Sequence, residues 1–189
     1  MALAYQEYYT LGDYRNWEGD WELIEGMPYA MTPAPGVSHQ AVSVNIVSQI
    51  KAEVDNNNKH CNACYVLMET DWQISNDTIV RPDIMLVCKE LDERVLVTPD
   101  LIVEVVSVSS TRRDELIKFD LYQREGVLYY ILVYPQEHRA KIFPNINFAV
   151  VNHKISIDNN GVFNLDISSS FVDSRKLEVK NNKILTKAC

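Results

Sequence analysis

Apolar residues recur along the chain with helical spacing in two long segments. Beyond Ser38 the apolar positions of an amphipathic helix are Val42, Ile46, Val47 and Ile50. We expect Ser38 to be the N-cap of this helix and the run Asn56-Asn57-Asn58 to end it. A second helix is predicted over residues 112–125, ended by Gly126, and a short one over residues 10–17 with Thr10 as its N-cap.

Runs rich in apolar and β-branched residues predict the strands. Segments 65–74 and 79–88 flank Ser75-Asn76-Asp77 and predict a hairpin, while segments 101–106 and 127–134 predict buried strands. Three smaller β-hairpins are expected, one with its turn at Gly26 and two with turns at residues 159–161 and 181–182. The element order predicts an α/β (α+β) fold with an α-β-β-β-α-β core and additional N- and C-terminal β-hairpins.

Composition places the chain among ordinary globular proteins. Its 189 residues are 47% hydrophobic and 23% charged, which suits one domain over residues 1–189 with a sizeable core. The core is expected over about residues 8–143, and the C-terminal β additions over about 144–189. No apolar stretch approaches the length of a membrane span, and no secretory signal is visible, so we expect a soluble, cytoplasmic protein without a membrane partner.

Net charge disfavours a nucleic-acid partner at first sight. The chain carries −8 at pH 7, and residues 1–100 hold 6 basic and 16 acidic side chains against 12 and 10 in residues 101–189. An acidic protein binds a phosphate backbone only through a local basic patch, which the second half can supply. Its candidate phosphate contacts are Arg112, Arg113, Arg124, Arg139 and Lys141. The alternative, that these are ordinary solvated surface residues, is the more common case.

The cysteines do not form a complete metal motif. Cys61-Asn62-Ala63-Cys64 is a single Cys-x-x-Cys pair, whereas zinc ribbons use two such pairs, and the strand-to-helix context of a redox site is missing. We therefore expect incidental loop cysteines, with a zinc or redox site as the minor alternative. Four free thiols would agree with a reducing compartment.

Two carboxylates stand in apolar strands, where their desolvation needs compensation. Asp83 heads the segment 84–87, and Glu104 interrupts the strand 101–106. Carboxylates on adjacent strands offer the hard oxygen ligands that Mg²⁺ prefers. The structural alternative is that Asp83 caps a turn and that Glu104 pairs with an arginine.

Lys118 falls on the apolar side of the helix that follows Glu104. At about 100° per residue it lies between Leu121 and Tyr122, whereas Arg113 lies with the polar residues on the other side. A lysine aimed at the core needs an anionic partner, and the Glu104 strand is close. The alternative is a side chain that extends to the rim of the core.

An ordered set of residues resembles a restriction-endonuclease-like family of small bacterial proteins in the PD-(D/E)XK nuclease superfamily. The resemblance covers about residues 8–143 and is carried by Glu22, His39, Arg81-Pro82-Asp83, residues 99–107, Ser109, Asp114, Lys118, Tyr122, Gly126-Val127 and Tyr130. It implies a restriction-endonuclease-like core in which helices flank a central mixed sheet.

The resemblance also implies a metal-dependent nuclease centre. Asp83, Glu104 and the backbone carbonyl of Val105 would bind Mg²⁺, with Mn²⁺ as a substitute. Val106 replaces the usual lysine two positions after Glu104, and Lys118 would take over its role. Glu22 and His39 would complete the catalytic set, and the partner would be nucleic acid, DNA ahead of RNA. Val108 and Tyr134 depart from the usual family residues.

Two other classes of function remain open from the sequence. One is a catalytically silent binding or regulatory module with a nuclease fold, which the acidic charge favours. The other is an interaction protein, for example a homodimer built on exposed hairpins or on Trp17, Trp21 and Trp72. Tryptophans are more often buried in a core than placed at an interface.

Overall fold

The computed structural model describes residues 7–31, 34–57, 64–107, 110–144, 155–156 and 164–165. Its centre is a five-stranded sheet in the order β3-β6-β7-β8-β9. The strands are β3 (Tyr65–Met68), β6 (Ile84–Val87), β7 (Leu101–Val105), β8 (Tyr129–Tyr134) and β9 (Arg139–Pro144). Only β7 and β8 pair in parallel, joined by a helical crossover, and the other pairs are antiparallel. The predicted mixed sheet and core order are confirmed.

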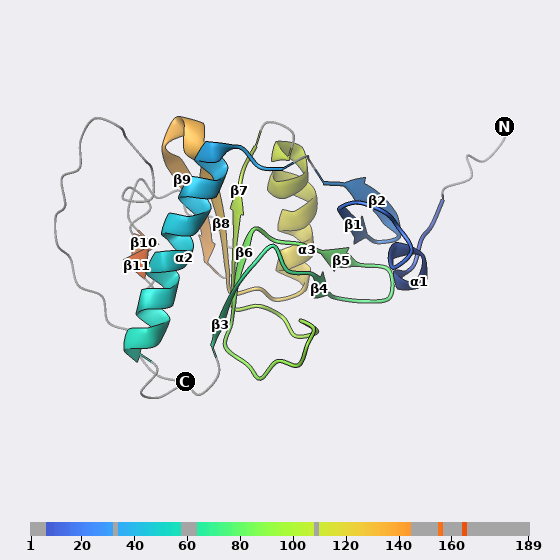
Figure 1. The fold of residues 1–189 in the computed structure, drawn as a ribbon, viewed down its shortest axis with the longest axis horizontal. Coiled ribbons are helices and arrows are strands. Elements are labelled where there is room, and N and C mark those ends of the chain that lie inside the picture. Colours follow the sequence, from blue (N-terminus) through green and yellow to red (C-terminus); the bar gives the residue numbers. More distant parts are fainter. Residues whose placement is uncertain are drawn as a thin grey trace.

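One face of this sheet packs against α2 (Val37–Asn57), as Figure 1 shows. Side chains of a strand alternate between its two faces, so every second residue of the central strands points toward α2. The α2 residues of this layer are Val42, Ile46, Ile50 and Val54, and all of them are buried. They meet Ile84, Val103 and Ile131, one from each of the three central strands.

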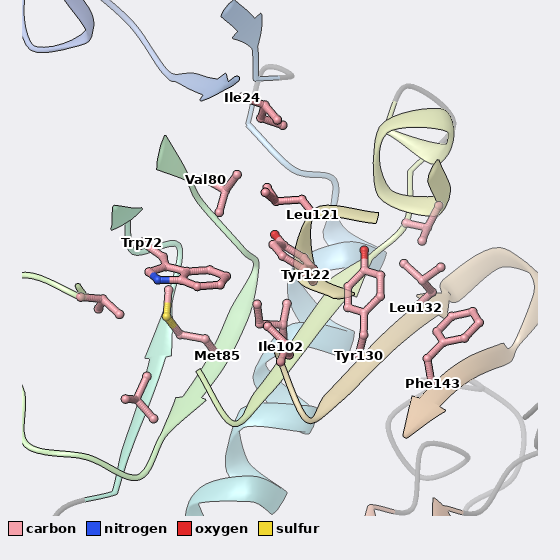
Figure 2. Close-up of a cluster of buried hydrophobic side chains, with 14 of the residues drawn as sticks. Ile24, Trp72, Val80, Met85, Ile102, Leu121, Tyr122, Tyr130, Leu132 and Phe143 are labelled. Atoms are coloured by element: carbon pink, nitrogen blue, oxygen red, sulfur yellow. The ribbon is translucent and has the colours of Figure 1, made fainter. Parts of the chain in front are cut away.

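The other face packs against the second helical segment, η1 (Arg113–Lys118) followed by α3 (Phe119–Arg124). The intervening residues of the same strands, Met85, Ile102 and Tyr130, form a second apolar layer with Leu121 and Tyr122 (Figure 2). Glu104 lies two residues beyond Ile102 and therefore faces this helical segment, because positions i and i+2 share a face.

A second, four-stranded sheet has the order β2-β1-β5-β4. It contains β1 (Trp21–Ile24), β2 (Met27–Ala30), β4 (Trp72–Gln73) and β5 (Ile79–Val80). Glu25 and Gly26 both have positive φ in the β1–β2 turn, a conformation that glycine adopts without steric cost. The predicted N-terminal hairpin is therefore confirmed, and beside it lies the short helix α1 (Leu11–Tyr14).

The expected hairpin of two continuous strands, 65–74 and 79–88, is wrong in one respect. Each arm divides into two strands, and the halves belong to different sheets. The first arm breaks at Glu69, whose φ of 45° is left-handed, and the second breaks at Pro82, which has no N–H for a sheet ladder. The break leaves Asp83 at the junction of the two sheets.

The helix boundaries differ slightly from the predicted ones. The helix α2 begins at Val37, and its first hydrogen bond runs from the Gln40 N–H to the Gly36 carbonyl, so Ser38 lies inside the first turn and is not the N-cap. The short helix α1 covers four residues, fewer than predicted, and the backbone N–H of Thr10 donates to the Asp13 carboxylate.

Beyond β8 the structure adds a strand that the sequence pattern did not single out. Strand β9 pairs along its length with β8 after a short 3-10 turn, Pro135–Glu137. The predicted hairpin around residues 159–161 agrees with the antiparallel pairing of β10 (Ile155–Ser156) and β11 (Asn164–Leu165). The hairpin predicted around residues 181–182 lies outside the described residues.

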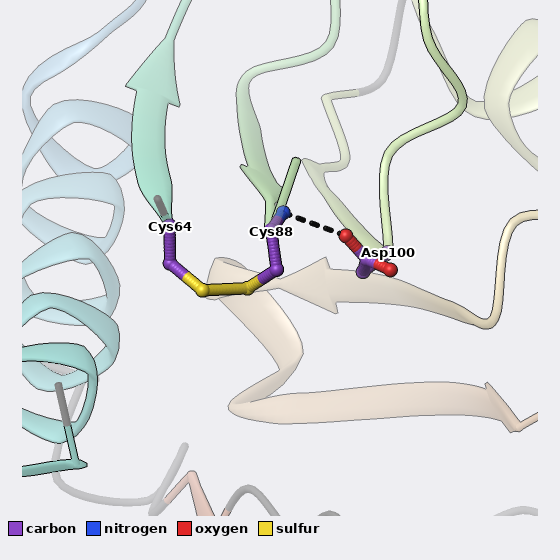
Figure 3. The surroundings of a disulfide bond; sticks show 3 residues. All are labelled: Cys64, Cys88 and Asp100. Carbon is purple, nitrogen blue, oxygen red and sulfur yellow. Dashed lines mark hydrogen bonds between the residues drawn. A yellow bond between two sulfur atoms is a disulfide. The ribbon is translucent and has the colours of Figure 1, made fainter. Parts of the chain in front are cut away.

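Cys64 and Cys88 form a disulfide next to the paired strands β3 and β6 (Figure 3). The expectation of four free thiols is therefore wrong for these two, and with it the inference of a reducing compartment loses its support. A zinc site at Cys61 and Cys64 is also excluded in this state, because the Cys64 sulfur is bonded to Cys88. None of the described helices combines the length and apolarity that a bilayer crossing requires.

The disulfide generates a prediction about stability. It spans a sequence separation of 24 residues, and closing a loop of this size in the unfolded chain stabilises the fold by about 3 kcal/mol. Cys88→Ser should therefore lower the free energy of unfolding by about that amount, as measured by urea titration without reductant. In the presence of reductant, wild type and variant should unfold at the same urea concentration. An identical midpoint for wild type with and without reductant would contradict the prediction.

Candidate active site

The candidate site is organised around the ammonium group of Lys118, at the end of η1. This side chain is buried, and its Nζ lies 2.7 Å from Glu22 Oε1 on β1 and 2.9 Å from Glu104 Oε1 on β7. The Tyr122 hydroxyl donates to the same Glu104 oxygen at 3.0 Å. The prediction that Lys118 faces the core and an anionic partner is confirmed, and its partners are two buried carboxylates.

Glu22 connects the small sheet to this centre. Its side chain is fully buried, and its Oε1 accepts the backbone N–H of Arg81 at 2.9 Å. The Nε of Arg113 lies 3.3 Å from Glu22 Oε2, an ion pair without the alignment of a hydrogen bond. A glutamate on β1 therefore fixes both Lys118 and the segment that leads to Asp83.

Asp83 lies beside Glu104, as the spacing of the two acids predicted. Asp83 Oδ2 accepts the backbone N–H of Val105 at 2.7 Å and lies 3.2 Å from His39 Nε2. The Asp83 N–H in turn lies 3.4 Å from Glu104 Oε2. The structural alternative considered for Glu104 is wrong, since Glu104 pairs with a lysine and not with an arginine. The start of β6 and the end of β7 therefore bring together Asp83, Val105 and His39.

Sequence reasoning missed Asp114 as a member of the site. Asp114 is 2% exposed, and its carboxylate lies 3.9 Å from Lys118 Nζ. The Tyr130 hydroxyl of β8 donates to the Asp114 backbone carbonyl at 3.0 Å, which holds this turn against the sheet. A signal was available, because Asp114 precedes Lys118 by four residues and so shares its helix face.

Arg113 does not lie on the polar side of the helix, contrary to the prediction. Residues Arg113–Lys118 form a π-helical segment with hydrogen bonds from i to i+5, so the 100° step of an α-helix does not apply there. The Arg113 side chain points to Glu22 and donates to the Ala30 carbonyl at 3.2 Å. The wider turn places Arg113, Asp114 and Lys118 around one centre, and π-helical turns occur frequently at functional sites.

Burial and charge perturb the ionisation of these groups. Burial raises the pKa of Glu104 well above its ordinary value, although the attraction of Lys118 opposes the shift. Burial also raises the pKa of Asp114. Burial by itself lowers the pKa of Lys118, but the carboxylates of Glu104, Glu22 and Asp114 outweigh it and raise this pKa well above its usual range. Lys118 therefore remains a cation at neutral pH.

The centre contains more carboxyl groups than cations. The carboxyl groups of Glu22, Asp83, Glu104 and Asp114 surround two cations, Lys118 and Arg113. A divalent cation beside Asp83 and Glu104 would favour the ionised form of both carboxyl groups. No group of three or more His, Cys, Asp or Glu side chains among the described residues is arranged to hold a metal. Two carboxylates with water are nevertheless a usual set for Mg²⁺, so the residues fit this ion.

These groups line a cleft of about 490 Å³ between the two sheets and the helical segment. Its wall includes His39, Asp83, Glu104, Val105 and Lys118, five of the predicted site residues; the sixth, Glu22, lies buried behind Lys118. A volume of this size accommodates a small ligand or part of a larger one. The carboxylates of Asp83 and Glu104 and the ammonium group of Lys118 are thus part of the wall that a bound ligand would contact.

Comparison with known proteins identifies the family of the chain. Residues 5–154 match the model of the Uma2 family, described as putative restriction endonucleases. The chain belongs to the Uma2 family. The resemblance to restriction-endonuclease-like proteins is thereby confirmed.

A solved structure shows the same fold as this Uma2-family chain. A crystal structure of a putative nuclease belonging to DUF820 from Anabaena variabilis superposes with a TM-score of 0.70 at 18% sequence identity, covering 87% of this chain and 99% of the other. The restriction-endonuclease-like fold is confirmed by this likeness, and no curated protein matches the chain.

Most of the predicted phosphate contacts are engaged elsewhere in this Uma2-family chain. Arg113 pairs with Glu22 inside the site, and Arg124 pairs with Glu25 at 2.6 Å. Two more of the predicted phosphate contacts lie on β9, where Arg139 pairs with Glu137 and Lys141 pairs with Glu115. Arg112 is exposed and does not line the cleft that contains Asp83, Glu104 and Lys118.

His39 generates a prediction about pH. Burial by itself lowers its pKa, but the hydrogen bond and charge of Asp83 outweigh burial, and the net pKa is raised. The stabilising contribution of His39 is therefore complete below its ordinary pKa of about 6.5 and is lost as pH rises through the raised value. His39→Gln should lower the free energy of unfolding more at about pH 5.5 than at about pH 8.5, measured by urea titration.

The control for this prediction removes the partner. In an Asp83→Asn background the difference between the two pH values should become smaller, because Asp83 contributes more to the raised pKa of His39 than Glu69 and Asp114 do. An equal loss at both pH values in the otherwise wild-type chain would contradict the pairing.

Proposed function

We propose that this Uma2-family protein is a metal-dependent nuclease that hydrolyses phosphodiester bonds, with DNA as its substrate ahead of RNA. The observation that carries the proposal is the convergence of Asp83, Glu104 and Lys118 on one cleft. The description of the family as putative restriction endonucleases supports nucleic acid as the substrate and favours DNA.

Asp83 and Glu104, with the backbone carbonyl of Val105, would hold Mg²⁺, and Mn²⁺ would substitute. When bound, such an ion lowers the pKa of a water ligand and polarises a phosphate oxygen. The Asp83 carboxylate is held in place by the Val105 N–H and by His39, so its orientation is set before any ligand arrives. His39 is therefore a positioning residue in this proposal.

Lys118 contributes a fixed positive charge at the floor of the cleft. Attack on phosphorus builds negative charge on the phosphate oxygens, and a cation already in position stabilises that charge without reorganisation. Glu22 holds the ammonium group from the side of the small sheet, and its 2.7 Å contact restricts where Lys118 can point. Glu22 is a second positioning residue, which acts through Lys118.

The metal assignment is tested by Asp83→Asn. We expect this variant to lose the heat of Mn²⁺ binding in calorimetry and to nick plasmid DNA about 100-fold more slowly or worse. Asp120→Asn is the matched control, since Asp120 is an exposed aspartate on the helical segment outside the cleft. Unchanged Mn²⁺ binding by Asp83→Asn would refute the assignment.

The role of Lys118 is tested by Lys118→Gln, which removes the charge but keeps a hydrogen-bond donor. Nicking should fall by about 100-fold, while Mn²⁺ binding persists because both carboxylates remain. Circular dichroism checks that the variant folds, since Glu22 and Glu104 lose their cation. A variant that folds, binds Mn²⁺ and nicks like wild type would exclude this role.

A binding or regulatory module without turnover is the second candidate. The net charge of −8 favours it, and so does the pairing of surface cations such as Arg124, Arg139 and Lys141 with acids. The same assay separates the two functions on plasmid, single-stranded DNA and RNA. Nicking by wild type that does not exceed that of the triple variant Asp83→Asn, Glu104→Gln, Lys118→Gln would support the silent module.

A further inference from the structure

A second cleft adjoins the catalytic one. It has a volume of about 480 Å³ and lies along α1 and the strands β4 and β5. Glu69 and Arg81 line both clefts, so the two are contiguous on the surface. Nothing in the proposed mechanism uses the second cleft, and its lining includes two further arginines, Arg15 and Arg94.

Arg15 and Arg94 stand out among the basic residues because their charges are not engaged. Of the arginines and lysines in the part of the chain that the structure describes, only Arg15, Arg94 and Arg112 have neither an ion pair nor a side-chain hydrogen bond. Two of these three guanidinium groups line the same cleft. The third, Arg112, lines neither cleft.

The backbone around both arginines is anchored to the small sheet. The Leu11 N–H, at the start of α1, donates to the Asn76 carbonyl in the β4–β5 turn, and Arg15 is the C-cap residue of α1. The Gln73 N–H of β4 donates to the Val95 carbonyl at 3.0 Å, which fixes the residue next to Arg94. The two guanidinium groups are thus carried on separate segments that are both tied to β4 and β5.

The cleft is lined by three acids and three arginines. Asp71 pairs with Arg81 at 2.7 Å, Glu69 accepts a hydrogen bond from the uncharged Gln40 at 3.3 Å, and Glu93 is the third acid. The N–H donors of the Arg15 and Arg94 side chains are not engaged, so they are available to a phosphate. The catalytic cleft, by contrast, contains Arg81, Arg113 and Lys118 only as cations already paired with carboxylates. A polyanion bound in the catalytic cleft would therefore meet unpaired guanidinium groups only in the adjoining second cleft.

We propose that the second cleft binds backbone phosphates of the nucleic acid that flank the bond to be cleaved. This inference rests on the proposed function. Arginine suits the task because its planar fork of N–H donors matches two phosphate oxygens. The nucleic acid would run from the carboxylate centre, across the boundary formed by Glu69 and Arg81, to Arg15 and Arg94. The site contributes affinity and orientation, and it takes no part in bond breaking.

The test measures binding of a fluorescein-labelled DNA duplex, and of its single strand, by anisotropy in EDTA across a salt series. The double variant Arg15→Gln, Arg94→Gln should bind about fivefold or more weakly near 0.1 M salt, and the slope of log K against log salt should fall by about one to two. Arg112→Gln is the matched control, because it removes an exposed, unpaired charge outside both clefts. Its affinity should stay within about twofold of wild type.

The outcomes separate this inference from the proposed function. Suppose that the wild type nicks DNA in Mg²⁺ and that the double variant binds DNA as well as Arg112→Gln does. This result would overturn the proposal that the second cleft binds phosphates, and it would leave the proposed nuclease function standing. Equal losses per charge in both variants also overturn it, since the effect would then follow net charge. A wild type that neither binds nor nicks overturns both proposals. Stronger retention of the duplex or of the single strand shows which form of the phosphate backbone the cleft holds.

Discussion

The ion cluster around Lys118 is the interaction on which the rest of the site depends. Removing one ammonium and several carboxylates from water is costly, and a buried ion pair often stabilises a fold no better than apolar packing would. Lys118 receives compensation from Glu22 and Glu104, which come from different sheets. Three segments that are distant in sequence must therefore meet at one atom. The cost of such a cluster is consistent with its retention for chemistry and not for stability.

The division of one long hairpin between two sheets creates the space for that chemistry. Had the arms continued as regular strands, Asp83 would sit within a ladder of hydrogen bonds. The left-handed turn at Glu69 and the missing N–H of Pro82 instead separate β4 and β5 from β3 and β6. Asp83 therefore lies between the two sheets, where it lines the cleft and its carboxylate accepts a hydrogen bond from the Val105 N–H.

The distribution of charge explains how an acidic protein can present a site for a phosphate chain. Seven of the eleven described lysines and arginines pair with an acid, so overall composition says little about local binding. In the catalytic cleft the carboxylates outnumber the cations, which suits a bound divalent ion. Guanidinium groups that are not engaged lie instead at Arg15 and Arg94, beside that cleft. In the function proposed above, one surface would carry the chemistry and the other would bind the phosphate backbone.

Local periodicity was enough to predict the α-β-β-β-α-β order of the core, the alternation that builds both apolar layers, and the burial of Glu104 and Lys118. The positions of Glu22 and His39 in the site came from the family resemblance, since neither has a distinctive local pattern. Only the tertiary structure decided that the hairpin divides between two sheets and that Cys64 bonds Cys88. It also decided that a π-helical turn brings Arg113 and Asp114 to the centre. Cross-strand pairing and helix winding of this kind depend on contacts between segments that are distant in sequence. Such contacts cannot be predicted from a short stretch of neighbouring residues.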